Sequence, residues 1–284
     1  MKLEPIATDE QSLTACAKLL SAAFPGDHHH TAAYLNWLYC ENPVGMVVGF
    51  NAWERDKIVG HYAALPVELY LDGYPTRGLL ALHTAIHPDF RNTGIIYSLA
   101  KKTCNAAREQ DFACIYAVAN AASTPIFTKA MGFQLVQQLS ASLGIAAIRP
   151  NWRIANNGNR FRRRWRSDTM RWRSNNPVNR TQILPCGDHG MAFYASTHIP
   201  GIRAYGLLQP EDHAPATGNR IGGVIRLFLG VMPEASCTWL TYFKIPERLK
   251  PSPLNLIYLP LNNSIPQVLA ANEVILGIQD FDPY

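Results

Sequence analysis

Apolar residues recur every three to four positions in two stretches near the start of the chain. The first stretch follows Asp9 and Ser12 and runs through Ala22, and the second follows Asp27 and runs through Tyr39. This spacing places the apolar side chains on one face of an α-helix. Because Asp and Ser are preferred at helix N-caps, we expect two amphipathic helices here.

The next three apolar segments lack the helical period and are rich in Val, Leu, Ile and Tyr. They cover residues 44–53, 57–70 and 76–86 and are separated by the turn sequences ERDK and LDGYP. Apolar runs bounded by turn residues predict strands joined by hairpins, so we expect an antiparallel meander.

The helical period returns over residues 95–110. An apolar run over 112–118, a short helical stretch over 124–131 and a further strand after Gly132 follow it. Helices and strands in this order build a mixed layer. We therefore expect an α+β fold with a mixed, largely antiparallel central sheet flanked by helices.

Length and composition narrow the class of protein. The chain has 284 residues, enough for one large domain or two ordinary ones, and 48% of them are hydrophobic. The start, MKLEPIATDE, is acidic, and no long uncharged apolar run occurs, so we expect neither a signal peptide nor a membrane span. The six cysteines lack metal-site spacing, which favours reduced thiols in a cytoplasmic protein without a metal.

The net charge of +5 is concentrated in one segment. Nine arginines and a single acid, Asp168, lie between Asn151 and Arg180. Arginine and tryptophan together, as in RFRRRWR at 160–166, can bind nucleic acid, an anionic membrane or a phosphorylated acceptor. The rest of the chain is mildly acidic, however, and arginines between two halves can pair with acids of both. We therefore favour a structural connector.

Two short sequences recur in the second half. NWLYCENP at 36–43 resembles RWRSNNP at 171–177, and CIYAVANAAS at 114–123 resembles LIYLPLNNS at 256–264. The offsets, 135 positions for the tryptophans and 142 for the tyrosines, are similar, which indicates internal duplication. We expect a first domain over residues 1–148, an Arg-rich connector over 149–170 and a degenerate copy over 171–284.

A glycine loop between strand and helix is the main candidate for a binding site. This loop lies within residues 83–96, HTAIHPDFRNTGII. It follows an apolar strand, contains the polar residues Arg91-Asn92-Thr93-Gly94 and precedes a helix. The first amides of a helix have no partners within it, and the helix dipole makes this end positive. Glycine lets an anion approach the amides closely, so the loop is a candidate phosphate cradle. The copy lacks this loop, and we expect a helix over its counterpart, residues 220–239.

The loop and its context resemble the GNAT superfamily of acyl-CoA-dependent N-acyltransferases. The central signature of this family is a strand, a loop, a helix and a second strand, followed by an Asn and a later Gly-Phe. Two segments match it, HTAIHPDFRNTGII and ANAASTPIFTKAMGF, and the resemblance covers about residues 1–145. The resemblance implies a GNAT-like fold, here in tandem, with acetyl-CoA or another short acyl-CoA as co-substrate. It implies that the amides of Arg91, Asn92, Thr93, Gly94, Ile95 and Ile96 hold the pyrophosphate, that Ala85 and Ile86 pair with the pantetheine arm, and that Asn120 lies close to it.

Two residues depart from the family pattern. Ile96 stands where the family usually has Gly or Ala, so the loop can sit differently on the phosphates. Phe127 stands where many relatives place a tyrosine that protonates the departing thiolate, and the alternative alignment places Thr128 there. Neither side chain is a good acid.

For the general base, the sequence offers two histidines. His83 lies on the strand that enters the loop and is the first candidate, and His61 on a neighbouring strand is the second, although a packed or surface histidine is the plainer interpretation of each. The run GDHHHT at 26–31 does not have the i, i+4 spacing of a helical metal pair, and we interpret it as a helix cap followed by solvated histidines.

These observations and the resemblance predict an N-acyltransferase that acts on a primary amine of a small molecule by direct attack in a ternary complex. An amino sugar, free or nucleotide-linked, is the favoured acceptor class, and nucleic acid is not the expected partner. Two alternatives stay open. One is aminoacyl or peptidyl transfer, as in tandem GNAT-like enzymes, and the other is a non-catalytic acyl-CoA sensor, in which Phe127 marks lost chemistry.

Overall fold

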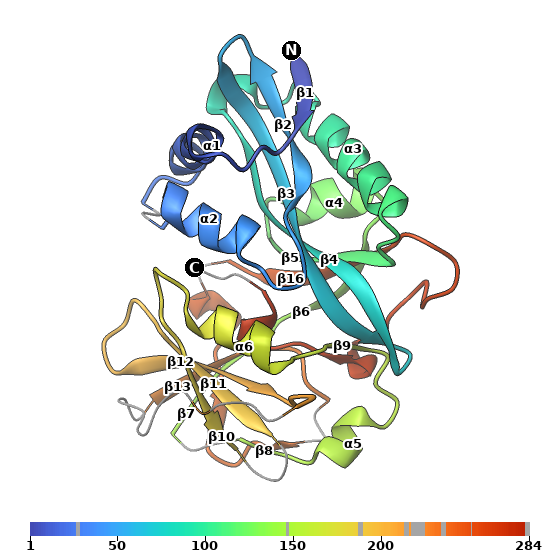
Figure 1. Ribbon diagram of the computed structural model, residues 1–284. Coiled ribbons are helices and arrows are strands. Elements are labelled where there is room, and N and C mark those ends of the chain that lie inside the picture. Colours follow the sequence, from blue (N-terminus) through green and yellow to red (C-terminus); the bar gives the residue numbers. More distant parts are fainter. Residues whose placement is uncertain are drawn as a thin grey trace.

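The protein has two lobes, each built on a β-sheet (Figure 1). The structure is a computed structural model that describes residues 1–26, 29–145, 148–186, 190–212, 216, 225–233, 237–250 and 252–281. Within these residues one sheet has nine strands and the other has six. A two-stranded ribbon of β8 (Arg149–Pro150) and β14 (Cys237–Thr238) accompanies them. The α+β class expected from the sequence is confirmed.

The large sheet carries the predicted meander. Its strand order is β1 (Lys2–Pro5), β2 (Val48–Glu54), β3 (Lys57–Leu71), β4 (Tyr74–Ile86), β5 (Cys114–Asn120), β16 (Leu254–Pro260) and β6 (Gln134–Gln138). β4 and β5 run parallel, whereas the other neighbours in this order run antiparallel. β9 (Phe161–Arg163) extends the sheet beside the far end of β3 and pairs with β17 (Val274–Ile275).

Helices cover both faces of this sheet (Figure 1). On one face lie α1 (Glu10–Ala23) and α2 (Ala32–Cys40), and on the other α3 (Ile95–Glu109) and α4 (Thr124–Ala130). Asp9 caps α1 as expected, because its carboxylate accepts a hydrogen bond from the Ser12 amide at 3.0 Å. The cap of α2 is Thr31, whose hydroxyl accepts from the Tyr34 amide, while the expected cap Asp27 lies outside the described residues.

The second lobe repeats the strand order of the first. Its sheet runs β10 (Gln182–Pro185), β11 (Met191–Ser196), β12 (Ile202–Leu208), β13 (Ile225–Gly230), β7 (Ser140–Gly144) and β15 (Tyr242–Lys244). Here too two central strands, β12 and β13, run parallel, as β4 and β5 do. Two helices, α5 (Trp152–Asn156) and α6 (Ser167–Ser174), precede it in the chain, as α1 and α2 precede β2. Short 3-10 helices are η1 (Pro88–Phe90), η3 (Glu247–Leu249), η4 (Ala271–Glu273) and η5 (Ile278–Asp280).

The helix predicted over residues 220–239 is wrong where the structure describes it. Ile225–Gly230 is β13, paired with β12 on one side and β7 on the other. The run is rich in Ile, Leu and Phe, which suit a central strand, and a short apolar run does not distinguish strand from helix by its period. Residues 220–224 and 234–236 lie outside the described residues.

Each lobe supplies one strand to the other lobe's sheet. β16, from the end of the chain, lies between β5 and β6 of the first sheet, and β7, from the first half, lies between β13 and β15 of the second. The two strands thus hold the same place in the two orders. This reciprocal exchange agrees with internal duplication and interlocks the lobes. The boundaries near residues 148 and 170 stay a prediction, and residues 254–260 pair across them.

The two sequence echoes have different structural meanings. Trp37 and Trp172 lie on α2 and α6, which hold the same place in the two halves, and their rings stack at 4.9 Å. Tyr116 and Tyr258, in contrast, are direct cross-strand partners in β5 and β16. These two strands do not correspond in the two sheet orders. Only the tryptophan pair therefore marks equivalent positions.

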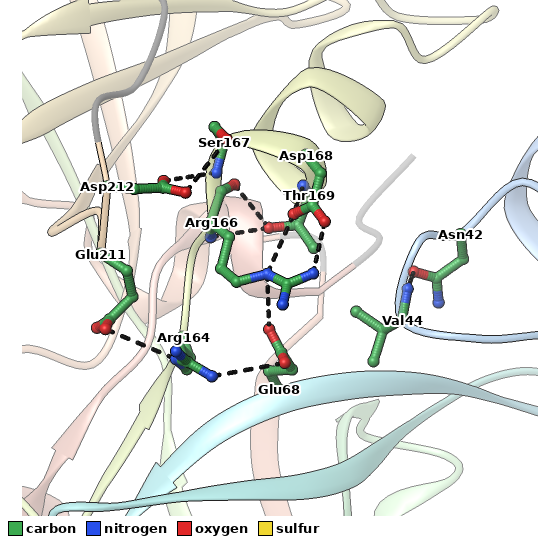
Figure 2. A network of polar contacts seen from close by, with 10 residues as sticks. All are labelled: Asn42, Val44, Glu68, Arg164, Arg166, Ser167, Asp168, Thr169, Glu211 and Asp212. Atoms are coloured by element: carbon green, nitrogen blue, oxygen red, sulfur yellow. Dashed lines mark hydrogen bonds and ion pairs between the residues drawn. The ribbon is translucent and has the colours of Figure 1, made fainter.

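The arginine-rich segment joins the lobes through ion pairs. Arg164 lies 3.6 Å from Glu68 of the first lobe and 3.6 Å from Glu211 of the second, and Arg166 contacts both Glu68 and Asp168 (Figure 2). Arg160 pairs with Asp72 at 2.6 Å. The prediction that these arginines pair with acids of both halves is confirmed.

Candidate functional site

A cavity of about 1000 Å³ opens where β4 and β5 separate. The two strands pair at Leu79–Ile115 and Leu80–Tyr116, and this is the full extent of their described ladder. Beyond it β4 continues to Ile86 and β5 to Asn120. The facing strand edges therefore have backbone groups available to an extended ligand arm that lies between them.

A β-bulge in β4 shapes one wall of this cavity. Ala85 pairs with His61 and Leu82 with Ala63, so His83 and Thr84 together face Tyr62 alone. His83 has φ of 47°, in the left-handed region. Such a bulge bends the strand and redirects its side chains. Here it brings the His83 ring to the cavity lining.

The glycine loop forms one end of the cavity. Asn92 and Gly94 both have positive φ, 65° and 77°, and α3 starts directly after Gly94 without a side-chain cap. Among the described residues, no acceptor takes a hydrogen bond from the amides of residues 92–96. An anion placed here would satisfy these amides and meet the positive end of the α3 dipole. A methyl group at Gly94 would find no atom within 4 Å, so the space above the loop is open.

The structure brings nearly all predicted site residues to this one cavity. Its lining includes the following of them: His83, Ala85, Ile86, Arg91, Asn92, Thr93, Gly94, Ile95, Ile96, Asn120 and Phe127. His61 is the exception, since it is fully buried behind the lining. The roles that the sequence suggested for these residues stay predictions.

Phe127 forms part of the cavity wall opposite β4. Its ring is 5% exposed and packs edge-on against Phe133 at 5.3 Å. The alternative position, Thr128, directs its hydroxyl to the Thr124 carbonyl within α4 and does not line the cavity. Of the two residues, Phe127 is therefore the one that lines the cavity, and it has no proton to donate.

Asn120 stabilises the turn between β5 and α4. Its side-chain oxygen accepts hydrogen bonds from the Ala122 amide at 3.1 Å and from the Ser123 amide at 2.9 Å. The Ser123 hydroxyl contacts the same oxygen at 3.0 Å. These contacts fix the start of α4 and with it the position of Phe127. The residue thus has a structural role in addition to its place on the cavity.

His83 joins a buried chain of polar side chains. Its Nδ1 lies 2.8 Å from the Tyr39 hydroxyl, which lies 2.9 Å from Nε2 of His61. Burial lowers the pKa of His61 to about 3, and the neighbouring His30 adds to this effect. Burial, followed by His30 and His61, also lowers the pKa of His83 well below its ordinary value. Both rings are therefore neutral at physiological pH.

Sequence reasoning missed Tyr39 and His30. The sequence pattern places Tyr39 only on an apolar helix face, and nothing in it indicates that the hydroxyl lies between two histidines. The interpretation of His30 as solvated is wrong: it is 7% exposed, and its ring meets that of His83 at 5.0 Å. The short segment before α2 folds back onto β4, which a local pattern does not predict. Asp27 and His28 of the same run lie outside the described residues.

The described residues contain neither a metal-binding cluster nor a membrane-spanning helix. No group of three or more His, Cys, Asp or Glu side chains is arranged to hold a metal ion there. No helix in that part of the chain is long and apolar enough to cross a membrane.

Comparison with known proteins points to one family. Residues 13–133 match the acetyltransferase (GNAT) family. This range contains the meander, the glycine loop, α3, β5 and α4. No curated protein matches the chain significantly.

Solved structures share the fold at low sequence identity. A probable N-acyltransferase from Enterococcus faecalis, a conserved protein of unknown function, is 10% identical with a TM-score of 0.56, covering 92% of this chain and 72% of its own. A GCN5-related N-acetyltransferase from Anabaena variabilis is 13% identical with a TM-score of 0.56, covering 92% and 73%. Eis1 from Mycobacterium abscessus is 10% identical with a TM-score of 0.51, covering 80% and 65%. The likeness spans both lobes and concerns the fold.

Proposed function

Because this chain is a member of the GNAT superfamily, we propose that it is an acetyl-CoA-dependent N-acyltransferase for a primary amine of a small molecule. One observation carries the proposal: a single cavity has an open helix N-terminus at one end and a neutral histidine on its wall. The amides of residues 92–96 would bind the pyrophosphate of coenzyme A. The separated edges of β4 and β5 would bind its pantetheine arm.

The reaction is direct attack in a ternary complex. The amine must lose a proton, attack the thioester carbon and form a C–N bond while the C–S bond breaks. His83 would take the proton at its ring nitrogen, which requires the neutral imidazole favoured by its lowered pKa. The leaving thiolate has a parent pKa of about 8.5, so it departs without obligatory protonation. Phe127 in place of an acid is therefore compatible with turnover.

The proposed acceptor class depends on which arginines are available to bind phosphate groups. A nucleotide-linked amino sugar, or an aminoacyl-tRNA for the alternative aminoacyl transfer, needs arginines for its phosphates. Three arginines of the Arg-rich segment, Arg160, Arg164 and Arg166, already pair with acids, and Arg91, the arginine in the cavity lining, lies at the proposed pyrophosphate site. We therefore propose a small amine without phosphates, an amino sugar among the candidates. The alternative, a non-catalytic acyl-CoA sensor, is supported by Phe127, which cannot donate a proton. The experiment below distinguishes the two.

Ligand-dependent unfolding and thiol release test the proposal together. Acetyl-CoA at about 100 times its dissociation constant should raise the free energy of unfolding by about 2.7 kcal/mol. A panel of primary amines, including amino sugars, should then release free coenzyme A thiol in the presence of the protein. Stabilisation without thiol release from any amine would favour the sensor. Absence of stabilisation by acetyl-CoA would contradict the proposal.

A further inference from the structure

A continuous chain of hydrogen bonds runs from the cavity into the core of the first lobe. It starts at His83 on the cavity wall, passes through the Tyr39 hydroxyl to His61, and ends at Asn51, whose side-chain oxygen lies 2.6 Å from Nδ1 of His61. The inner members are fully enclosed, since Tyr39 and His61 are 0% exposed and Asn51 is 1% exposed. Three different elements, α2, β2 and β3, supply them.

The side-chain amide of Asn51 sets the direction of this chain. Its Oδ1 faces Nδ1 of His61 at 2.6 Å, its Nδ2 donates to Sγ of Cys16 at 3.5 Å, and the Cys16 thiol also reaches Oδ1 at 3.8 Å. An amide oxygen can only accept, and Nδ1 of His61 must therefore carry a proton. Nε2 of His61 is then the acceptor for the Tyr39 hydroxyl. The Tyr39 oxygen in turn accepts from Nδ1–H of His83, which leaves Nε2 of His83 as the basic nitrogen.

We infer that Asn51, His61 and Tyr39 are positioning residues that hold His83 in the tautomer whose Nε2 takes the proton of the acceptor amine. The inference rests on the proposed function and assigns these three residues a role in it. Of the three, only His61 was a candidate from the sequence, as the second choice for the general base. Because His61 is fully buried and does not line the cavity, it acts through Tyr39 and does not touch the substrate.

The chain suits both protonation states of His83. When Nε2 gains a proton, Nδ1 keeps its own, so the hydrogen bond to Tyr39 persists and strengthens as the ring becomes charged. No side chain has to turn, and the proton leaves again through the cavity. An unrestrained imidazole in solution distributes its proton between both nitrogens. Fixing one tautomer raises the fraction of enzyme that is ready to react.

Several titratable side chains surround the His83 ring and influence its pKa. The described titratable groups that face the ring are His30 at 5.0 Å, Tyr34 at 6.0 Å, Tyr39, and His61 behind it. His30 also lowers the pKa of His83, so a change in His83 titration must be compared at constant His30. The tests below leave His30 unchanged.

Tyr39→Phe removes the middle of the chain with little change in shape, and Tyr62→Phe is its matched control. Tyr62 is also fully buried, lies next to His61 on β3, and has a hydroxyl with no hydrogen-bond partner among the described residues. We expect Tyr39→Phe to lower kcat by about tenfold or more, as expected for loss of base positioning, with the KM for acetyl-CoA unchanged. Its kcat–pH profile should shift, because the Nδ1–H of His83 loses its acceptor. Tyr62→Phe should retain both kcat and the profile.

Ring-nitrogen NMR reads the tautomers without any substrate. Long-range proton–nitrogen spectra of the full-length protein should show Nδ1–H with unprotonated Nε2 for both His61 and His83 at neutral pH. Asn51→Leu has no acceptor and should mix the tautomers of His61 and lower kcat.

The outcomes separate this inference from the proposed function. Wild-type protein that transfers no acetyl group to any amine overturns the proposed function and the role of the chain with it. Wild-type protein that is active, with a Tyr39→Phe variant of equal kcat and equal pH profile, overturns the inference alone. A His83 that carries its proton on Nε2 in the spectra overturns it as well, even if Tyr39→Phe fails to fold.

Discussion

Three residues of the cavity wall hold a left-handed backbone conformation: His83, Asn92 and Gly94, with φ of 47°, 65° and 77°. For glycine this conformation is free of strain, whereas for histidine it costs free energy that the surrounding structure must offset. At His83 the β-bulge and the hydrogen bond to Tyr39 help to stabilise this conformation. The conformation turns the amides after Gly94 and the ring of His83 toward the same cavity.

Gly94→Ala should weaken acetyl-CoA binding, and Gly73→Ala provides a matched control. Both glycines have φ near 80°, and at both a methyl group meets nothing within 4 Å. Each substitution should therefore lower the free energy of unfolding by a similar amount, about 1–2 kcal/mol. Only the methyl at Gly94 stands over the candidate phosphate site. We expect titration calorimetry to show weaker acetyl-CoA binding for Gly94→Ala alone, and equal affinities in both variants would contradict the assignment of the loop.

His83→Asn should separate chemistry from folding. Asparagine tolerates the left-handed region better than other side chains, and its Nδ2 can donate to Tyr39 in place of Nδ1. It cannot act as a base. We expect kcat to fall by about 10²- to 10⁴-fold, while the midpoint of thermal unfolding and acetyl-CoA affinity change little. Retention of full activity would show that another group, or water, removes the proton.

At the scale of elements, the site is held by turns at the ends of β4 and β5. The bulge and the glycine loop end β4, and the Asn120 turn ends β5 and starts α4. Because β4 and β5 separate beyond Leu80, these turns decide how wide the cavity is. The Asn120 turn also contacts the second half of the chain, since Ser252, just before β16, accepts a hydrogen bond from the Ala121 amide at 3.4 Å.

Asn120→Ala should loosen this turn, and Asn120→Asp should preserve it. Alanine removes the oxygen that accepts from two amides, a loss similar to that of a helix cap, so we expect the free energy of unfolding to fall by about 1 kcal/mol. Aspartate keeps the acceptor. Chemical denaturation of both variants measures the difference, and acetyl-CoA binding should follow the same order. If both variants lost affinity equally while keeping stability, Asn120 would instead contact the ligand through its amide nitrogen.

The sequence predicted the elements of the first lobe because their signals are local. Hydrophobic periodicity, helix caps and turn residues within a few positions predict the meander, α1, α3 and the glycine loop. The predicted loop lies at the cavity. The polar chain behind His83 joins Tyr39 to residues 51 and 61, which only the folded sheet brings together. The same holds for β13 and for the exchange of β7 and β16, because strand partners are not encoded in a local pattern.

At the scale of the whole molecule, stability should fall as pH drops below about 6.5. The folded protein keeps His61 neutral down to a pKa of about 3, whereas the unfolded chain takes up that proton near pH 6.5. The lowered pKa of His83 acts in the same direction. Each such histidine contributes up to about 1.4 kcal/mol per pH unit in this window. Buried Asp280 opposes them, because burial raises its pKa to about 6 and its protonation favours the folded state.

Urea unfolding between pH 7 and pH 4 measures this balance. Two histidines against one carboxyl should give a net loss of stability on acidification. His61→Gln should flatten the loss, because one of the two titrating groups is gone, and Asp280→Asn should steepen it. A wild-type stability that rises steadily from pH 7 to pH 4 would contradict the buried neutral histidines.

The exchange of strands predicts that the first lobe does not fold by itself. Without β16, the facing edges of β5 and β6 lose the strand between them, and the buried side chains Leu256, Ile257 and Tyr258 leave the two faces of the sheet. An open edge of this kind also favours aggregation. A fragment of residues 1–148 should therefore be insoluble or unfold without cooperativity, whereas co-expression with residues 149–284 should restore a soluble complex that binds acetyl-CoA. Cooperative unfolding of the isolated fragment would instead show that its sheet closes without the second lobe, and β16 would then be an accessory strand.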